Sequence, residues 1–136
     1  MPPQVVHAGC GKDPRLPSAR SRIGRSAEIA AAAELGRQGY RIVASNYRCR
    51  LGEIDFVAEE SGFLVFVEVR CKRTDTFGSP AESITASKRA RIAASAQCYV
   101  DERGIKDVDC RFDVVEVGAS GGRLGVTRII RDAFSV

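Results

Sequence analysis

Two carboxylates in the segment GEIDFVAEESGFLVFVEVR, residues 52–70, could bind a cation or an arginine if the strands that carry them pair as a hairpin. A tight turn is predicted at Ser61-Gly62, because two-residue loops of this kind join the strands of β-hairpins. In that register the residue numbers across the hairpin add to 123, so Asp55 lies directly opposite Glu68. Side chains that face each other across a ladder have Cβ atoms roughly 5 Å apart. The sequence therefore predicts that the two carboxylates meet.

Two carboxylates in contact need compensation, because like charges opposite each other destabilise a sheet and burial disfavours the charged form. One possibility is an ion pair with Arg70, which lies on the same strand face as Glu68. The other is a hard divalent cation such as Mg²⁺, which takes one or two carboxylates and leaves room for a phosphate. The same register sets Glu53 opposite Arg70, whereas a three-residue loop would point Glu68 away.

The elements that position this hairpin indicate an α/β fold, with a central mixed sheet of about five strands flanked by helices. An alanine-rich helix is expected over residues 22–38, with Gly39 as its stop. A second helix is expected between the N-cap Thr85 and the stop Gly104, after a short turn at 80–84. Further strands are expected at residues 40–50, 110–117 and 123–130, with 131–136 as a short tail.

The length and charge of the chain limit its domain organisation and the kinds of partner that it can bind. The chain has 136 residues, the size of one domain. Four prolines and no periodicity predict a flexible leader over residues 1–20, followed by a single domain over residues 21–136. No stretch is apolar enough for a membrane span or a signal peptide, so a cytoplasmic protein without membrane contact is expected. Residues 1–50 hold nine Lys or Arg against three acids, which suits a polyanionic partner.

Cysteine and histidine usage argues against other kinds of site. The five cysteines form no CxxC pair, which disfavours both a disulfide framework and a structural zinc site. The one histidine, His7, lies in the predicted leader, so a Ser-His or Cys-His arrangement has no credible base.

Short motifs are spread over the chain in a specific order. They are Gly24 with Ala27-Glu28, Gly39-Tyr40, Asn46-Tyr47-Arg48, Gly52-Glu53-Ile54-Asp55, Phe66-Val67-Glu68-Val69-Arg70, Phe77-Gly78, Lys88, Arg111-Phe112-Asp113-Val114-Val115 and Asp132-Ala133-Phe134. This succession resembles the YraN family, also called UPF0102. The resemblance covers nearly everything after the leader, and several separated motifs make it far more specific than any one alone.

Members of that family look like the restriction-endonuclease-like superfamily with PD-(D/E)xK sites, and in layout like archaeal Holliday-junction resolvases. The resemblance implies hydrolysis of phosphodiester bonds with Mg²⁺ or Mn²⁺, in branched or otherwise structured DNA. By position, Asp55 and Glu68 match the two acids of the motif, and Glu28 matches the acid of the first helix. The resemblance implies that Asp55, Glu68 and the Val69 carbonyl hold the cation. Glu28 would act through a second metal or a water, and Arg70 would stabilise developing charge.

One position departs from the superfamily pattern, because Arg70 stands where a lysine is expected. An arginine can bind a phosphate through two hydrogen bonds, but with a pKa above roughly 12 it cannot act as a general base. Lys72, on the same strand face, and Lys88, in the second helix, are candidates for the missing ammonium. The departure favours an alternative, a catalytically silent nucleic-acid-binding module that keeps the nuclease fold. A scaffold in which Glu68 and Arg70 are structural is the third hypothesis.

The expected partner is nucleic acid, DNA more than RNA, and the likeness to resolvases suggests a homodimer. Basic side chains near the predicted site could track a phosphate backbone. They are Arg22, Arg25, Arg48, Arg50, Lys72, Arg73 and Lys88, with Arg89 and Arg91 extending the surface. The loop at 74–80 is placed to grip a substrate, and its Phe77 either stacks on a base or packs under the loop.

Overall fold

The computed structural model describes residues 19–71, 84–120 and 122–135, and side chains in the first helix from residue 24 onward. Two helices and five strands follow one another in the predicted order. They are α1 (Ala19–Arg37), β1 (Arg41–Cys49), β2 (Gly52–Glu60), β3 (Phe63–Cys71), α2 (Ala86–Glu102), β4 (Asp109–Ser120) and β5 (Arg123–Phe134). The predicted α/β fold with a five-stranded mixed sheet is confirmed, and it is consistent with a restriction-endonuclease-like fold.

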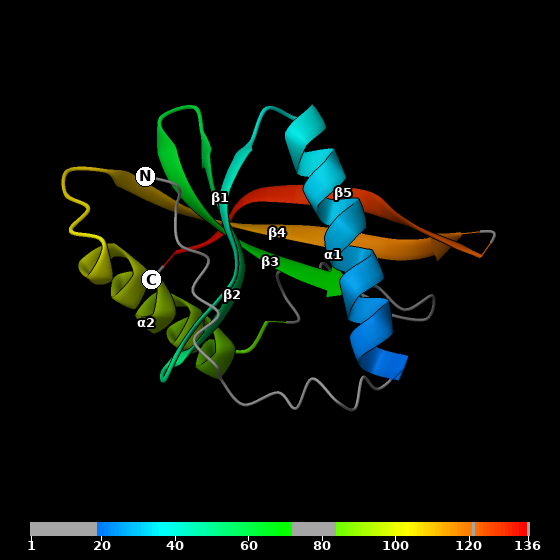
Figure 1. Cartoon of the computed structure of the whole chain (residues 1–136), viewed down its shortest axis with the longest axis horizontal. Coiled ribbons are helices and arrows are strands. Elements are labelled where there is room, and N and C mark those ends of the chain that lie inside the picture. Colours follow the sequence, from blue (N-terminus) through cyan, green and yellow to red (C-terminus); the bar gives the residue numbers. More distant parts are fainter. Residues whose placement is uncertain (1–18, 72–83, 121, 136) are drawn as a thin grey trace.

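The sheet has the strand order β1-β2-β3-β4-β5, in which β3 and β4 are parallel and the other neighbours are antiparallel. A parallel pair needs a crossover, and α2 provides it. The two helices pack in separate apolar clusters, one containing Ala27, Ala31 and Leu35 of α1 and the other containing Ile92 and Tyr99 of α2. Figure 1 shows the helices well apart, with strands of the sheet running between them.

One end of each helix is set by the residue that the sequence indicates. Gly39 has a φ of +94°, and the Tyr40 N–H bonds the Leu35 carbonyl at 2.9 Å, which closes the last turn of α1. Thr85 caps α2 by accepting a hydrogen bond from the Lys88 N–H at 3.1 Å. The first helix begins at Ala19, three residues before the predicted start.

The hairpin of β2 and β3 has the predicted register. Its pairs run from Glu60 with Phe63 to Phe56 with Val67. The turn residues Ser61 and Gly62 have φ values of +51° and +83°, as a tight two-residue hairpin loop requires. The ladder ends at Phe56 and Val67, so the strands separate before the positions of the two candidate carboxylates.

Because the β2–β3 ladder ends at Phe56 and Val67, one predicted cross-strand pair is not formed. The prediction that Glu53 pairs opposite Arg70 is wrong, because β2 and β3 no longer pair there. Glu53 instead pairs with Arg48 of β1, both in the ladder and through an ion pair of 3.1 Å.

The predicted tail is also wrong, since β5 continues to Phe134. Phe134 pairs with Phe112 of β4, and their rings stack with centroids 5.1 Å apart. The segment has few apolar residues, but this aromatic contact buries Phe134 and extends the strand.

Several predictions fall on residues outside the described part of the chain. These are the leader, Cys10, His7, Lys72, Arg73 and the loop at 74–80 with Phe77. Among the described helices none is long and apolar enough to cross a membrane.

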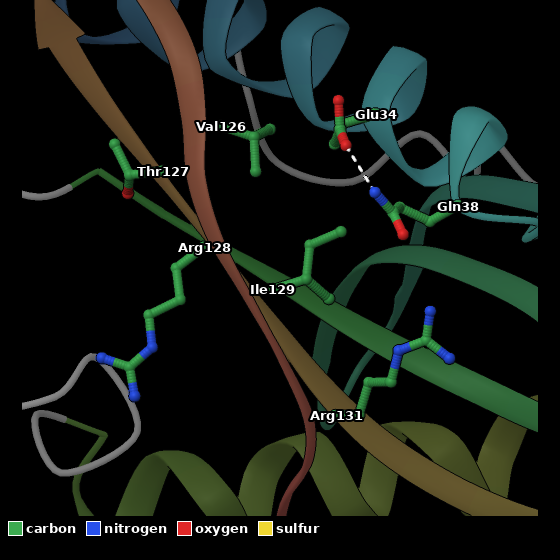
Figure 2. Close-up of a pocket in the computed structure, with 7 residues that line it drawn as sticks. All are labelled: Glu34, Gln38, Val126, Thr127, Arg128, Ile129 and Arg131. Carbon is green, nitrogen blue, oxygen red and sulfur yellow. Dashed lines mark hydrogen bonds between the residues drawn. The ribbon is translucent and has the colours of Figure 1, made fainter.

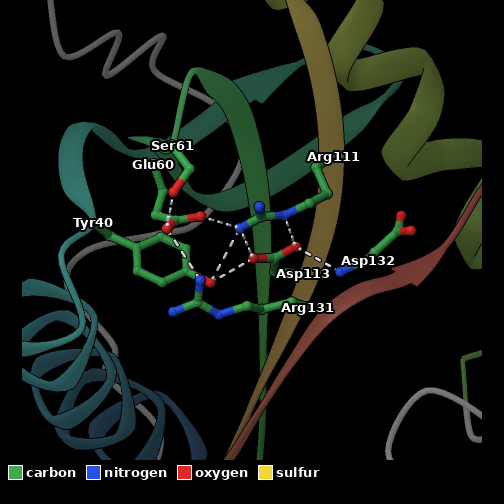
Figure 3. Close-up of polar contacts among 7 residues, drawn as sticks. All are labelled: Tyr40, Glu60, Ser61, Arg111, Asp113, Arg131 and Asp132. Carbon is green, nitrogen blue, oxygen red and sulfur yellow. Dashed lines mark hydrogen bonds and ion pairs between the residues drawn. The ribbon is translucent and has the colours of Figure 1, made fainter.

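A buried polar network joins the connection between α1 and β1 to the hairpin and the last two strands (Figure 3). Asp113 is fully buried and accepts hydrogen bonds from the Tyr40 hydroxyl at 2.6 Å and from two nitrogens of Arg111 at 2.8 Å each. The backbone N–H of Asp132 donates to the same carboxylate at 2.9 Å. Arg111 also pairs with Glu60 at 2.9 Å, so its buried charge is balanced on two sides.

Removing the centre of this network should destabilise the fold. Asp113→Ala leaves the Tyr40 hydroxyl without its acceptor and removes one of the two acidic partners of the Arg111 guanidinium, so the free energy of unfolding should fall by about 3 to 5 kcal/mol. Urea denaturation measures the change. Glu59→Ala is the control, because it breaks an exposed ion pair with Arg41 and should cost under about 1 kcal/mol. Equal losses in the two variants would contradict a structural role for the network.

Candidate active site

Asp55 lies just beyond the last paired residues of β2 and β3. Its side chain makes the hydrogen bond to β3 that a backbone carbonyl of β2 would make if the ladder continued. Its Oδ2 accepts a hydrogen bond from the Val69 N–H at 2.8 Å. A buried N–H requires an acceptor, and this carboxylate supplies it where the neighbouring strand no longer does. The N–H and carbonyl of one strand residue point to the same side, so the Val69 carbonyl also faces the gap.

Three carboxylates act on one another at this gap. Burial is the largest cause that raises the pKa of Asp55 well above its ordinary value, and the negative charge of Glu68 is the second. The charge of Glu28 and a hydrogen bond with the Glu68 carboxyl raise this pKa further, while the Val69 N–H lowers it. Asp55 and Glu68 therefore interact, but the predicted pairing of these two residues across the β2–β3 ladder is not formed, because the ladder ends before them.

The two other acids reach Asp55 from opposite faces of the sheet. Glu68 alternates with Val67 and Val69, which pack on the α1 side, so its side chain lies on the α2 side. Glu28 follows the buried Ala27 on α1. The gap between β2 and β3 thus brings together groups from both helical layers.

Glu68 has a cationic neighbour from the second helix. The Lys88 Nζ lies 2.7 Å from Glu68 Oε2, and the Glu68 side chain is only 11% exposed. A lysine in the first turn of a helix opposes the helix dipole, so its position there calls for a local partner. Of the two lysines considered for the missing ammonium, Lys88 is thus the one that the structure describes beside the carboxylates.

The donors at the gap fit a hard cation in type. Asp55, Glu68 and the Val69 carbonyl offer only oxygen, and Mg²⁺ commonly binds one or two carboxylates and completes its shell with water and phosphate. Among the described residues, no group of three or more Asp, Glu, His or Cys side chains is arranged to hold a metal ion. The fit therefore rests on two carboxylates and one backbone carbonyl.

The predicted nucleic-acid contacts divide into three groups. Arg25 and Arg50 are exposed, and Arg48 is partly buried in its ion pair with Glu53. Arg22 lies in α1, where the structure does not describe its side chain, and Lys72 and Arg73 are outside the described residues.

A shallow pocket of about 330 Å³ lies elsewhere, between α1 and β5. Figure 2 shows Glu34 and Gln38 of α1 across from the side chains of β5. Its lining contains none of the residues predicted for the site: it consists of Glu34, Gln38, Val126, Thr127, Arg128, Ile129 and Arg131.

Sequence reasoning gave no role to Asn46 at this site. Its side-chain amide donates a hydrogen bond to Glu28 Oε1 at 3.3 Å, and its backbone has a φ of +52° inside β1. The sequence signal for this irregular position was an asparagine inside a predicted strand. Asparagine is uncommon in strands and adopts the left-handed conformation more readily than most residues.

Comparison with known proteins places this arrangement among related chains. A family described as "Uncharacterised protein family UPF0102" matches residues 27–117. A UPF0102 protein of Symbiobacterium thermophilum is 47% identical over 114 residues, which cover 83% of this chain and 96% of that protein. A UPF0102 protein of Moorella thermoacetica is 46% identical over 116 residues, covering 85% of this chain and 97% of the other.

The raised pKa of Asp55 predicts a pH-dependent gain in stability for Asp55→Asn. Between the unfolded pKa and the raised folded pKa, the folded protein binds more protons than the unfolded chain, so its stability falls as pH rises. The variant cannot titrate at this position, while its amide oxygen can still accept from Val69. Its free energy of unfolding should therefore increase relative to wild type as pH rises through that interval.

Thermal or urea unfolding across pH, with a chelator present, measures this gain. The exposed Asp109→Asn is the control for loss of one carboxylate. At a pH below the unfolded value both forms of residue 55 are neutral, so the gain should vanish there. The prediction would be contradicted if the free energies of unfolding of Asp55→Asn and wild type differed by the same amount at all pH values, or if the variant were less stable than wild type at neutral pH. Either result would show that the charged form of Asp55 does not destabilise the fold.

Proposed function

The chain belongs to the UPF0102, or YraN, family, and from the carboxylates gathered at the end of its β2–β3 ladder we propose that it is a metal-dependent endonuclease acting on structured DNA. The supporting observation is that Asp55, held by the Val69 N–H where the β2–β3 ladder has ended, interacts electrostatically with Glu68. A partly buried carboxylate and a buried one that repel each other are costly for a fold, and costs of this kind concentrate at functional sites.

The proposed cofactor is Mg²⁺ or Mn²⁺, held by Asp55, Glu68 and the Val69 carbonyl. When bound, such a cation activates a water and neutralises charge on the scissile phosphate. Glu28 approaches from α1 and suits a bridging water or a second cation. Burial, and after it the negative charge of Glu68, raises the pKa of Asp55 in the protein alone, and a bound divalent cation would instead favour the charged form of both carboxylates.

Lys88 is the group proposed to replace the lysine missing at position 70. Its Nζ lies next to Glu68, where it can donate a hydrogen bond to a phosphate oxygen or to the attacking water. Arg70, which follows Glu68 by two residues on the same strand face, can bind the phosphate but cannot accept a proton. Charge stabilisation is thus divided between two side chains of different elements.

The second candidate is a nucleic-acid-binding module without cleavage. The ion pair between Lys88 and Glu68 favours it, because this pair already balances one of the two carboxylates without a cation. The exposed Arg25 and Arg50 would serve either function. The two candidates agree on binding and differ only in whether the carboxylates are needed for a reaction.

Cleavage and binding assays on the same DNA substrates distinguish the candidates. Wild type should cleave a four-way junction, a flap or single-stranded DNA with Mg²⁺ or Mn²⁺, and Asp55→Ala should lose cleavage while keeping its affinity for DNA. Lys88→Gln should cleave about 100-fold more slowly, as expected when one donor to a developing charge is removed. Gel-based cleavage rates and fluorescence anisotropy provide the two measurements.

Lys106→Gln is the matched control, because Lys106 is an exposed lysine in the loop after α2. It loses the same charge and should cleave like wild type. Binding without cleavage on every substrate, with either cation, would favour the silent module. Cleavage that survives Asp55→Ala would contradict the proposed site.

A further inference from the structure

The alternation of side chains is interrupted in β1. Ala44 and Tyr47 both pack in the apolar cluster on the α2 side, although they are three positions apart in the strand. In a regular strand two such positions face opposite sides of the sheet. One residue between them must therefore have an irregular backbone.

The alternation of side chains between the two faces of the sheet is also interrupted in β2. Ile54 packs in the cluster on the α2 side, whereas Phe56 packs in the cluster on the α1 side. Residues two apart in a regular strand would share a face. The residue between them is Asp55, so the interruption lies at the candidate active-site carboxylate.

The register places the two interruptions directly opposite each other. Ser45 pairs with Phe56 and Tyr47 pairs with Ile54, so Asn46 faces Asp55. Asn46 has a φ of +52°, the left-handed conformation, while the pairs on either side are in the β1–β2 ladder. Asn46 is thus the irregular residue between Ala44 and Tyr47, apart from the register shift between Ile42 and Ala44. Asp55 lies outside regular pairing with both neighbouring strands.

The consequence for Asp55 is a changed direction of its carboxylate. A regular strand residue points its side chain perpendicular to the sheet. Asp55 instead bonds the backbone N–H of Val69 on the neighbouring strand, within the plane of the sheet. The Asn46 amide also bonds Glu28, which links the irregular position to α1.

We propose that Asn46 is a positioning residue: its left-handed backbone interrupts the β1–β2 ladder opposite Asp55 and turns that carboxylate into the gap beside Val69 and Glu68. The contribution of Asn46 to catalysis rests on the proposed function, whereas its effect on the direction of the Asp55 carboxylate does not. Asn46 touches neither cation nor substrate in this account, and it acts through Asp55.

Two substitutions separate the backbone of Asn46 from its side chain. Asn46→Gly keeps the left-handed conformation, whereas Asn46→Val disfavours it because of the branched Cβ. Ser61→Gly and Ser61→Val form the matched control pair, since Ser61 has a φ of +51° in the hairpin turn and also donates a side-chain hydrogen bond to a glutamate.

Native-state hydrogen exchange of the Val69 amide is the structural readout. In Asn46→Val this amide should exchange about tenfold faster than in Asn46→Gly, as loss of a hydrogen bond to a charged group predicts. Other amides of β3 should change less than Val69. The two Ser61 variants should not differ at Val69, even where Ser61→Val lowers overall stability.

Mn²⁺ affinity by calorimetry is the functional readout. Asn46→Val should bind Mn²⁺ roughly tenfold or more weakly than Asn46→Gly, the usual loss when a group that orients a ligand is changed. The inference would be overturned if Asn46→Val accelerated hydrogen exchange at Val69 no more than at the other β3 amides. It would also be overturned if Ser61→Val accelerated exchange at Val69 equally. Absence of Mn²⁺ binding by wild type would count against the proposed function alone, because the Val69 result still decides the role of Asn46.

Discussion

The separation of β2 from β3 after Phe56 and Val67 is the constraint on which the site depends. While the strands pair, each backbone N–H between them has a carbonyl as its acceptor. Where they separate, the Val69 N–H needs a new acceptor, and the Asp55 carboxylate provides one at 2.8 Å. This single bond fixes a charged group in the plane of the sheet, where Glu28 can approach from one layer and Glu68 from the other. A longer ladder would fill the gap with backbone bonds and leave no place for the carboxylates.

The residues of the family motifs form two sets with different physical roles. Tyr40, Arg111, Asp113 and the backbone of Asp132 make a buried network whose charges and hydrogen bonds are matched. Glu28, Asn46, Asp55 and Glu68 gather at the gap, where like charges oppose one another and the pKa of Asp55 is raised. The first set stabilises the fold, and the second brings several acids together, of which Glu68 is paired with Lys88. That contrast separates a structural polar cluster from a candidate site without reference to any activity.

Local chemistry in the sequence was sufficient to predict the element order, the caps and the hairpin register. Ser61-Gly62 fixed the register, and Gly39 and Thr85 fixed helix ends, because each acts through its own backbone or nearest neighbours. The end of the β2–β3 ladder at Phe56 and Val67 was not predictable in this way, because the alternation of residues continues through this segment of the sequence without a turn or breaker residue. The extension of β5 to Phe134 likewise depends on stacking against Phe112, a contact between residues 22 positions apart. Lys88 was a candidate from sequence, but its contact with Glu68 required the packing of α2.

The central claim is that Asp55 and Glu68 together hold a divalent cation, and a crystal structure with Mn²⁺ tests it most directly. Crystals grown with Mn²⁺ and a short phosphorothioate oligonucleotide supply both the cation and a phosphate that resists cleavage. The account predicts an anomalous peak roughly 2.0 to 2.3 Å from one oxygen of Asp55 and one of Glu68, with the Val69 carbonyl close by. An ordered oligonucleotide with no such peak, and with Lys88 still paired to Glu68, would contradict it.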